Sequence, residues 1–169
     1  MLESSGAPQQ KRGPLGSPNR DLLKLTYELR SPSDSPDWDA YHAIRRRVLF
    51  ERRGRMGVYD AAHPDEQKPG NHPKVLALGR EVLGVIRIDL APPQAVFRRV
   101  AVREDRQRRG LGTILLGLAE QFALQHHCKE LASHVDRDAV AFYTKCGFTV
   151  TGSAPLEAST VLMSKKIIG

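Results

Sequence analysis

Glycines and arginines gather in a short run between two apolar stretches, and this run carries the densest set of residues suited to chemistry. It spans residues 107–113 (QRRGLGT). Gly110 and Gly112 would let the backbone pass close to a ligand, and the first turn of a following helix has N–H groups without partners inside the helix. The helix dipole and four neighbouring arginines would add positive potential, from Arg103, Arg106, Arg108 and Arg109. The run predicts a site for anionic oxygens, and a solvated basic turn is the ordinary alternative for an isolated Gly-x-Gly.

This glycine run differs from two well-known phosphate-binding motifs. A P-loop would need Gly-Lys-Ser/Thr after the glycines, and a dinucleotide fingerprint would need glycine in place of Leu115. Cys128 and Cys146 are the two cysteines of the chain, and their spacing does not suit a zinc knuckle. We therefore expect both to be reduced, packed thiols and expect no metal site.

Alternating apolar residues predict the strands that must position the glycine run. The predicted strands cover residues 22–29, 74–78, 82–90, 95–102, 129–135, 148–153 and 159–168. Gly79, Arg80 and Glu81 separate the second and third of these, which is typical of a hairpin turn. The strand over 95–102 leads directly toward the glycine run.

Apolar residues at helical spacing predict three helices. The first begins with Ser35 as N-cap and has an apolar face made of Trp38, Tyr41, Ile44 and Val48. The second covers residues 113–127, and one face of it is lined by Leu111, Leu115, Leu118 and Phe122. A short third helix begins at Asp136 or Asp138 and ends at Gly147. Residues 52–73 show no periodicity and predict a long loop, a kind of segment that tends to be functional.

Composition favours one compact domain with anionic partners. The chain has 169 residues, of which 40% are hydrophobic, and a formal net charge of +7. Residues 1–20 are rich in Gly, Pro, Ser and Gln, so we expect a disordered tail there and a folded domain over 21–169. The sequence shows neither an apolar run of membrane-spanning length nor a signal-peptide core, which predicts a cytoplasmic protein without membrane contact. The order of elements predicts an α+β fold, an α/β sandwich with one mixed sheet and helices on its faces.

Two segments resemble the GCN5-related N-acetyltransferase (GNAT) superfamily. Residues 107–112, preceded by the strand residues Val100-Ala-Val102, are similar to its acetyl-CoA-binding motif Q/R-x-x-G-x-G/A. Residues 136–148 (DRDAVAFYTKCGF) are similar to its segment N-x-x-A-x-x-F-Y-x-x-x-G-F, with Asp136 where asparagine is usual. The resemblance covers residues 22–168 and implies the acyl-CoA N-acyltransferase fold. In that fold the sheet is mostly antiparallel, its central strands splay apart, and helices lie on both faces.

The resemblance implies acetyl-CoA as co-substrate, with the pantetheine arm between the splayed strands. Backbone groups of Val100, Ala101 and Val102 would hold that arm. The pyrophosphate would lie on amides of the glycine run, which comprises Gln107, Arg108, Arg109, Gly110, Leu111, Gly112 and Thr113. Phe142 and Asp136 complete the implied cofactor-binding set. Asp136 keeps an acceptor but lacks the two amide donors of asparagine, so its contact with the cofactor is in question.

The resemblance also implies direct acetyl transfer to a primary amine, with Tyr143 as the general acid that protonates the departing thiolate. A phenol with a pKa of about 10 suits a thiol leaving group with a pKa of about 8 to 9. The tetrahedral oxyanion would form against a backbone N–H of the splayed strand, and neither cysteine is needed as nucleophile. A helix aromatic packed beside Phe142 is the alternative interpretation of Tyr143.

The sequence does not identify a general base. Many members of the family carry a glutamate in the strand before the pyrophosphate loop, but residues 94–99 read QAVFRR, without a carboxylate. The other candidates are Asp89, Glu51, Asp60 and His134. Each has an ordinary structural explanation, such as an ion pair of Glu51 with Arg47 or Arg55. Deprotonation through water, without a dedicated base, is a further alternative.

Arginines are also dense near the end of the first predicted helix. Arg45, Arg46, Arg47, Arg52, Arg53 and Arg55 would form a basic rim where the family admits its acceptor, which would suit an acidic or phosphorylated acceptor. A solvated helix face is the more ordinary interpretation of such a run.

Three hypotheses of function follow. The first is an acetyl-CoA-dependent N-acetyltransferase with an unidentified amine acceptor, in which the family permits a homodimer. The second is a CoA-binding sensor without transfer activity, motivated by the missing strand carboxylate and by Asp136. The third is a basic nucleic-acid-binding module, which an aromatic content of 6% and the lack of recognisable nucleic-acid motifs disfavour.

Overall fold

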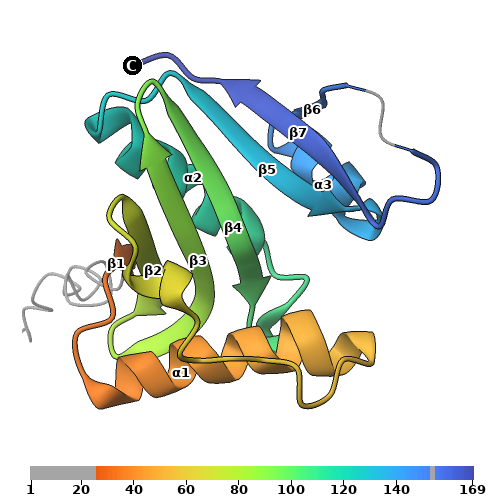
Figure 1. The fold of residues 1–169 in the computed structure, drawn as a ribbon. Coiled ribbons are helices and arrows are strands. Elements are labelled where there is room, and N and C mark those ends of the chain that lie inside the picture. Colours follow the sequence, from red (N-terminus) through yellow and green to blue (C-terminus); the bar gives the residue numbers. More distant parts are fainter. Residues whose placement is uncertain (1–25, 153–154) are drawn as a thin grey trace, which may run out of the picture.

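Seven strands form one mixed sheet in the computed structural model, which describes residues 26–152 and 155–169 (Figure 1). Their order across the sheet is β1-β2-β3-β4-β5-β7-β6. Their bounds are β1 Tyr27–Arg30, β2 Asn71–Leu78, β3 Glu81–Ala91, β4 Gln94–Val102, β5 Glu130–Asp136, β6 Thr149–Val150 and β7 Thr160–Lys166. Neighbouring strands are antiparallel except β4 and β5, which are parallel. The predicted mixed, mostly antiparallel sheet is confirmed.

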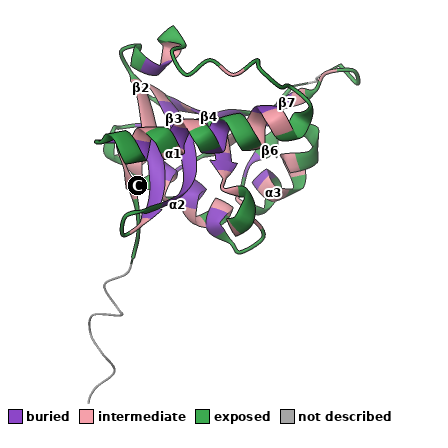
Figure 2. Ribbon diagram, turned by 90° about the horizontal axis from the view of Figure 1, so that it is seen from below, coloured by how far each residue is buried: buried purple, intermediate pink, exposed green. Residues whose placement is uncertain are grey.

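Helices cover both faces of the sheet, because the central strands are apolar on both sides. α1 (Ser35–Arg45) packs on one face, where Val75 and Val85 join its side chains in one buried cluster. α2 (Leu111–Gln125) packs on the other face with Leu76 and Ile86, and α3 (Val140–Lys145) contributes to the same cluster. Successive side chains of a strand point to opposite faces, so each strand serves both clusters. Figure 2 shows the buried strand residues between α1 and α2.

The ends of α1 differ from the prediction. Asp34, rather than the predicted Ser35, is the N-cap, because its extended backbone lets its carboxylate accept a hydrogen bond from the Asp37 N–H at 2.9 Å. Beyond α1 the chain continues in a π-helical turn, η2 (Arg46–Phe50), and a 3-10 turn, η3 (Glu51–Arg53). Gly54 ends this run with φ of +74°, in the left-handed region that favours glycine.

Other predicted boundaries shift by a few residues. β1 begins at Tyr27, and the first part of the strand predicted over 22–29 lies outside the described residues, as does the predicted tail over 1–20. α2 begins at Leu111, earlier than the predicted residue 113. The predicted loop over 52–73 contains the 3-10 turn η4 (Pro64–Gln67) and gives its last residues to β2. In the segment predicted as a strand over 148–153, β6 covers Thr149–Val150, and residue 153 is not described. Two further 3-10 turns, η5 (Glu104–Arg106) and η6 (Arg137–Ala139), follow β4 and β5.

β4 and β5 pair over a short stretch and then diverge. Their register runs from Gln94↔Glu130 to Phe97↔Ser133, although β4 continues to Val102 and β5 to Asp136. The Ser133 hydroxyl donates to the Phe97 carbonyl at 3.0 Å where the pairing ends. On its other edge β4 has a register shift against β3, and Arg99 lies there with φ of +55°. The splayed central strands implied by the resemblance are present.

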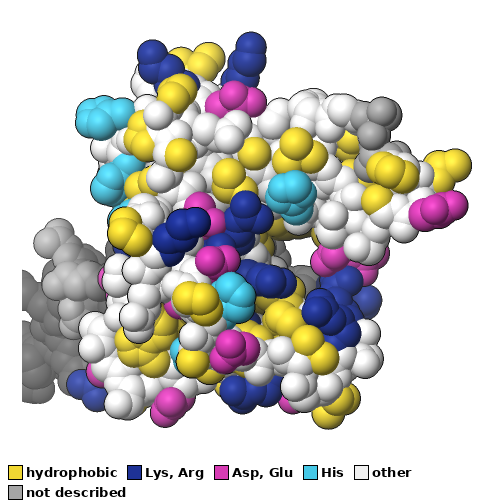
Figure 3. All heavy atoms as spheres, viewed as in Figure 1, with side chains coloured by type: hydrophobic (Ala, Val, Ile, Leu, Met, Phe, Trp, Pro, Cys, Tyr) yellow, Lys and Arg dark blue, Asp and Glu magenta, His cyan; other side chains and the backbone are white. Residues whose placement is uncertain are grey.

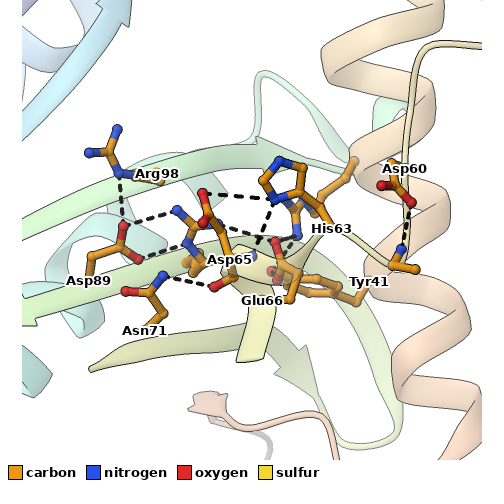
Figure 4. Close-up of polar contacts among 11 residues, drawn as sticks. Tyr41, Asp60, His63, Asp65, Glu66, Asn71, Asp89 and Arg98 are labelled. Carbon is orange, nitrogen blue, oxygen red and sulfur yellow. Dashed lines mark hydrogen bonds and ion pairs between the residues drawn. The ribbon is translucent and has the colours of Figure 1, made fainter. Parts of the chain in front are cut away.

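A buried polar network ties α1, η4 and β3 together beside this divergence (Figure 4). Glu66 accepts hydrogen bonds from the Tyr41 hydroxyl at 2.7 Å and from Arg45 at 2.6 Å, and Arg87 lies 3.4 Å from the same carboxylate. Burial alone would raise the pKa of Glu66. The Tyr41 hydrogen bond and the charges of Arg45 and Arg87 outweigh burial and hold that pKa below its ordinary value. Glu66 is therefore an ionised carboxylate whose charge the surrounding arginines require.

We expect Glu66→Gln to lower the free energy of unfolding at pH 7 by about 3 kcal/mol or more, because Arg45 would keep its buried charge without a counter-ion. Urea denaturation measures this loss. Glu104→Gln is the matched control, since Glu104 pairs with Arg47 on the exposed surface at 2.7 Å and its loss should leave the unfolding midpoint close to that of the wild type.

Comparing the wild type with Glu66→Gln at several pH values tests whether Glu66 is charged. A carboxylate whose folded pKa is lowered contributes stability above its ordinary pKa of 4.5 and loses it as the pH falls through the folded value. The difference between the wild type and Glu66→Gln should therefore narrow below about pH 4.5. A difference that stays constant down to pH 3 would contradict an ionised Glu66.

Candidate active site

A large cavity opens where β4 and β5 diverge. Its volume is about 1590 Å³, and it is lined by the second half of β4, the end of β5, the start of α2, α3 and the segment from η2 to β2. Figure 3 shows this hollow between the β5–β7 side and the α1 side of the molecule, with basic and acidic side chains around it. A cavity of this size exceeds a typical pocket for one small molecule and can hold two substrates side by side.

The structure brings nearly all predicted site residues to this one cavity. Its lining includes Val100, Ala101, Val102, Gln107, Arg108, Gly110, Leu111, Gly112, Thr113, Asp136, Phe142 and Tyr143. Arg109 is the exception, since it is exposed and lies outside the cavity lining. The cofactor-binding and catalytic roles of these residues stay predictions.

The glycine run turns the chain sharply between β4 and α2. Arg108 and Gly110 both have left-handed backbone, with φ of +63° and +79°. The Gln107 side chain donates to the Val102 carbonyl at 3.0 Å and so ties the turn to the end of β4. No side chain within the described ranges caps the N-terminus of α2. The N–H groups of its first turn, and the positive end of its dipole, are therefore available to an anion at the cavity wall.

The two glycines serve different purposes in this turn. Gly110 supplies the left-handed backbone, and a side chain there would project into open space. Gly112 instead makes room for Phe142, because a Cβ atom at position 112 would lie 2.8 Å from the ring of Phe142. The second glycine thus lets α3 pack directly against the start of α2.

The packing interpretation of Tyr143 is confirmed, and its catalytic role stays a prediction. Its ring packs edge-to-face with Phe142 and Phe148, at centroid distances of 5.5 and 5.3 Å, and it also lines the cavity. Burial raises the pKa of its phenol to about 12, while a hydrogen bond with Ser133 acts in the opposite direction. Tyr143 is therefore a protonated phenol at neutral pH, held in a fixed position at the end of the β4–β5 pairing.

Asp136 lies in the cavity but is engaged by a residue from the other side. Arg53 of η3 lies 3.3 Å from Asp136 and 3.6 Å from Asp138, at the end of β5. These ion pairs link the two sides of the cavity. They give Asp136 a structural partner that the sequence did not predict.

The candidates for a general base fall into two groups. Glu51 lies 3.8 Å from Arg47 and outside the cavity lining, so one of its two predicted ion-pair partners is found and the other, Arg55, is not. Asp89 lines the cavity, but Arg87 and Arg98 bind both of its oxygens at 2.7 to 3.0 Å (Figure 4). Asp60 and His134 also line the cavity, and Asp60 accepts a hydrogen bond from the Ala62 N–H at 2.9 Å.

The arginine-rich segment forms neither a continuous rim nor a uniformly solvated face. Arg45 is buried in the Glu66 network, which corrects both interpretations for that residue. Arg47 and Arg52 lie near Glu104, at 2.7 and 3.6 Å, and Arg46 stacks over the ring of Tyr59 at 5.2 Å. Arg53 and Arg55 line the cavity together with Arg45. A sequence run with one charge type is thus divided by the helix turn into separate roles.

Sequence reasoning missed the residues that close the cavity beneath the long loop. Glu66, Arg87 and Tyr59 all line it. Tyr59 and His42 interact through their side chains at 2.6 Å. Glu66 lies in a segment without periodicity, so no local pattern marks it. The one available signal was Tyr41, whose place on an apolar helix face requires a buried partner for its hydroxyl.

Within residues 26–152 and 155–169, no group of three or more His, Cys, Asp or Glu side chains could hold a metal ion. Cys128 is buried and Cys146 half-buried, and both are free thiols. No helix in these ranges is long and apolar enough to cross a bilayer.

Known proteins share this fold. A family model described as "Acetyltransferase (GNAT) family" matches residues 25–148. A candidate N-acetyltransferase from Lactobacillus plantarum is 26% identical, with a TM-score of 0.69 over 84% of this chain and 99% of that one. The PaiA N-acetyltransferase from Thermoplasma acidophilum, solved in complex with coenzyme A, is 18% identical, with a TM-score of 0.66 over 85% and 100% of the two chains.

A further structure is similar in fold. The Escherichia coli ribosomal-protein-S18-alanine N-acetyltransferase is 17% identical, with a TM-score of 0.65, over 85% of this chain and 97% of that one. The match of the family model covers well over half of the chain and includes both motif segments. This protein belongs to the GNAT family of acetyltransferases.

Proposed function

We propose that this acetyltransferase moves the acetyl group of acetyl-CoA directly to a primary amine. One observation carries the proposal: the stretch where β4 leaves β5, the uncapped start of α2 and the buried phenol of Tyr143 line the same cavity. These are the three parts that the reaction needs, namely a binding edge, an anion site and a proton donor.

The unpaired edge of β4 suits the pantetheine arm. Ala101 and Val102 pair with Val85 and Gly84 of β3, and β5 has already diverged on the opposite side. The backbone groups on that side are therefore available to the amides of an extended ligand, which would lie there like a short strand. The pyrophosphate then falls on the first turn of α2, beside Arg108. Because Arg109 is outside the cavity, we assign it no contact with the pyrophosphate.

The reaction proceeds by attack of a neutral amine on the thioester carbonyl. A C–N bond forms, the carbonyl oxygen becomes an oxyanion, and the C–S bond then breaks. The register shift around Arg99 leaves two residues of β4 facing one of β3, which frees backbone N–H groups to stabilise the oxyanion. Tyr143 gives its proton to the departing thiolate, and burial keeps the phenol protonated at neutral pH before the thiolate forms.

The proton of the amine leaves through water or through a nearby side chain. Asp60 and His134 are the candidates that line the cavity without an arginine partner in the described part of the chain. Asp89 is held by two arginines, which favour its charged form but occupy its lone pairs.

One folded domain over 21–169, a cytoplasmic location and a homodimer stay expectations from the sequence.

Tyr143→Phe tests the proton donor, since it keeps the ring packing and removes the hydroxyl. We expect turnover to fall by about 100-fold or more, as for loss of a general acid, with little change in acetyl-CoA affinity by calorimetry. Tyr27→Phe is the control, because Tyr27 is an exposed phenol on β1. Wild-type turnover in Tyr143→Phe would exclude the assigned role. The sensor hypothesis would be supported if the wild-type protein bound CoA but released no free thiol from acetyl-CoA with any amine of a broad panel.

Gly110→Asp and Gly110→Asn test the pyrophosphate site as a matched pair. Both side chains tolerate left-handed backbone better than other residues and differ in charge rather than shape. The position faces open space, so neither should disturb the packing. We expect the aspartate to weaken acetyl-CoA binding about tenfold more than the asparagine, because it places a negative charge beside the phosphates. Equal dissociation constants in calorimetry would contradict this placement.

A further inference from the structure

Two arginines line the cavity and have no carboxylate partner within the described residues. Arg99 lies on β4 and Arg55 follows η3, and both line the cavity. Their guanidinium groups lie over the ring of Phe50, at 5.4 and 4.8 Å from its centroid. The neighbouring Arg53, Arg87 and Arg98 are each ion-paired, whereas no carboxylate within the described residues lies within 4.0 Å of Arg99 or Arg55.

The nearby carboxylates are already shared among other arginines. Glu66 is contacted by Arg45 and Arg87, and Asp89 by Arg87 and Arg98. Two acidic groups thus serve three arginines before Arg99 and Arg55 are considered. Glu66 and Asp89 therefore leave Arg99 and Arg55 without an ion-pair partner, which favours an anionic ligand beside these two arginines.

Two further aspartates line the cavity from the long loop, but each is engaged there. Asp60 accepts a hydrogen bond from the Ala62 N–H at 2.9 Å. Asp65 lies 3.8 Å from His63 (Figure 4). Neither aspartate lies within 4.0 Å of Arg99 or Arg55, so neither forms an ion pair with these two arginines.

The Arg99 side chain is exposed to solvent within the cavity, but protein atoms lie around its guanidinium group. Desolvation, followed by repulsion from Arg45, Arg87 and Arg55, lowers its pKa, and Glu66 offsets this in small part. An arginine stays charged despite such a shift. Burial and the neighbouring arginines therefore make the charged form of Arg99 less favourable, and a bound anion would offset this repulsion.

The place of these arginines relative to the reaction fixes which substrate they would meet. Arg99 directly precedes the β4 residues assigned to the pantetheine arm. Its guanidinium packs on Phe50 of η2, on the face of the sheet that α1 covers. The phosphates of the cofactor are assigned to the opposite end, at the start of α2. Arg99 and Arg55 therefore lie beside the reacting end of the thioester, where the acceptor must bind.

We propose that the acceptor is an amine that also carries an anionic oxygen group, a carboxylate or a phosphate, which Arg99 and Arg55 bind. The inference rests on the proposed function, since it concerns the second substrate of that reaction. A guanidinium presents a planar fork of N–H donors that matches either group. Free amino acids and short peptides would supply a carboxylate, and phosphorylated amines would supply a phosphate.

Matched amines test the proposal in an assay of thiol release from acetyl-CoA. Three forms of each amine share one carbon skeleton and carry a carboxylate, a carboxamide or a phosphonate. We expect kcat/KM for one of the two anionic forms to exceed that of the carboxamide by about 10- to 100-fold, the range for a charge-assisted hydrogen bond. The preferred anion identifies the source as carboxylate or phosphate.

Variants then assign the preference to the two residues. Arg99→Gln and Arg55→Gln should each bring the ratio of anionic to neutral substrate toward one, and Arg99→Lys should keep part of it, because the charge remains and the fork is lost. Arg80→Gln removes the same charge in the exposed β2–β3 turn, outside the cavity, and should keep the wild-type ratio. Because Arg55 is exposed, its variant tests the proposal even if Arg99→Gln fails to fold.

Failure of this inference is distinct from failure of the proposed function. Thiol release with equal kcat/KM for all three forms, or an unchanged ratio in both glutamine variants, overturns the anion site alone. If no amine releases thiol, thermal stability of the CoA-bound protein decides: the N-acetylated carboxylate or the N-acetylated phosphonate should raise the melting temperature, and the N-acetylated carboxamide should not. An equal effect of both, or an acid-specific effect that persists in both glutamine variants, overturns the proposal.

Discussion

The site depends on a parallel strand pair that ends early. β4 and β5 exchange hydrogen bonds over four residue pairs, up to Phe97↔Ser133. Past that point two strand edges face a common space, and buried edge groups need partners. A sheet that continued to pair would have neither a cavity nor free backbone groups along the second half of β4. The rest of the site is arranged around this opening, with α2 starting at one end of it and Tyr143 located where the pairing stops.

Electrostatics divides the cavity into two parts with different purposes. At the start of α2 the positive potential comes from backbone N–H groups and the helix dipole. Such a helix N-terminus suits a phosphate group. Beneath the long loop it comes from side chains, and Glu66 there holds α1, η4 and β3 together through its ion pairs with Arg45 and Arg87. These ion pairs engage Glu66 and Asp89 within the region that we propose for the acceptor. The same contacts that stabilise the fold shape what the enzyme can bind.

Local patterns predicted most of the fold, and contacts between distant residues account for what the sequence could not predict. The β2–β3 hairpin, β4, α2 and the glycine turn follow from periodicity and from backbone demands within a few residues. Glu66 was missed because its partners Tyr41, Arg45 and Arg87 are more than twenty residues away in sequence. Arg45 was misread for the same reason, since its neighbours in the run suggest solvent. The ion pair of Arg53 with Asp136 likewise depends on how two loops meet.

The contact between Gly112 and Phe142 joins the two motif segments into one packing unit. The ring of Phe142 occupies the space that a side chain at position 112 would fill. A side chain at position 112 therefore requires the Phe142 ring to move or to be replaced by a smaller residue, on the same helix as Tyr143. Whether a side chain is tolerated at position 112 therefore depends on which residue stands at position 142, so two segments about thirty residues apart in sequence share one packing constraint.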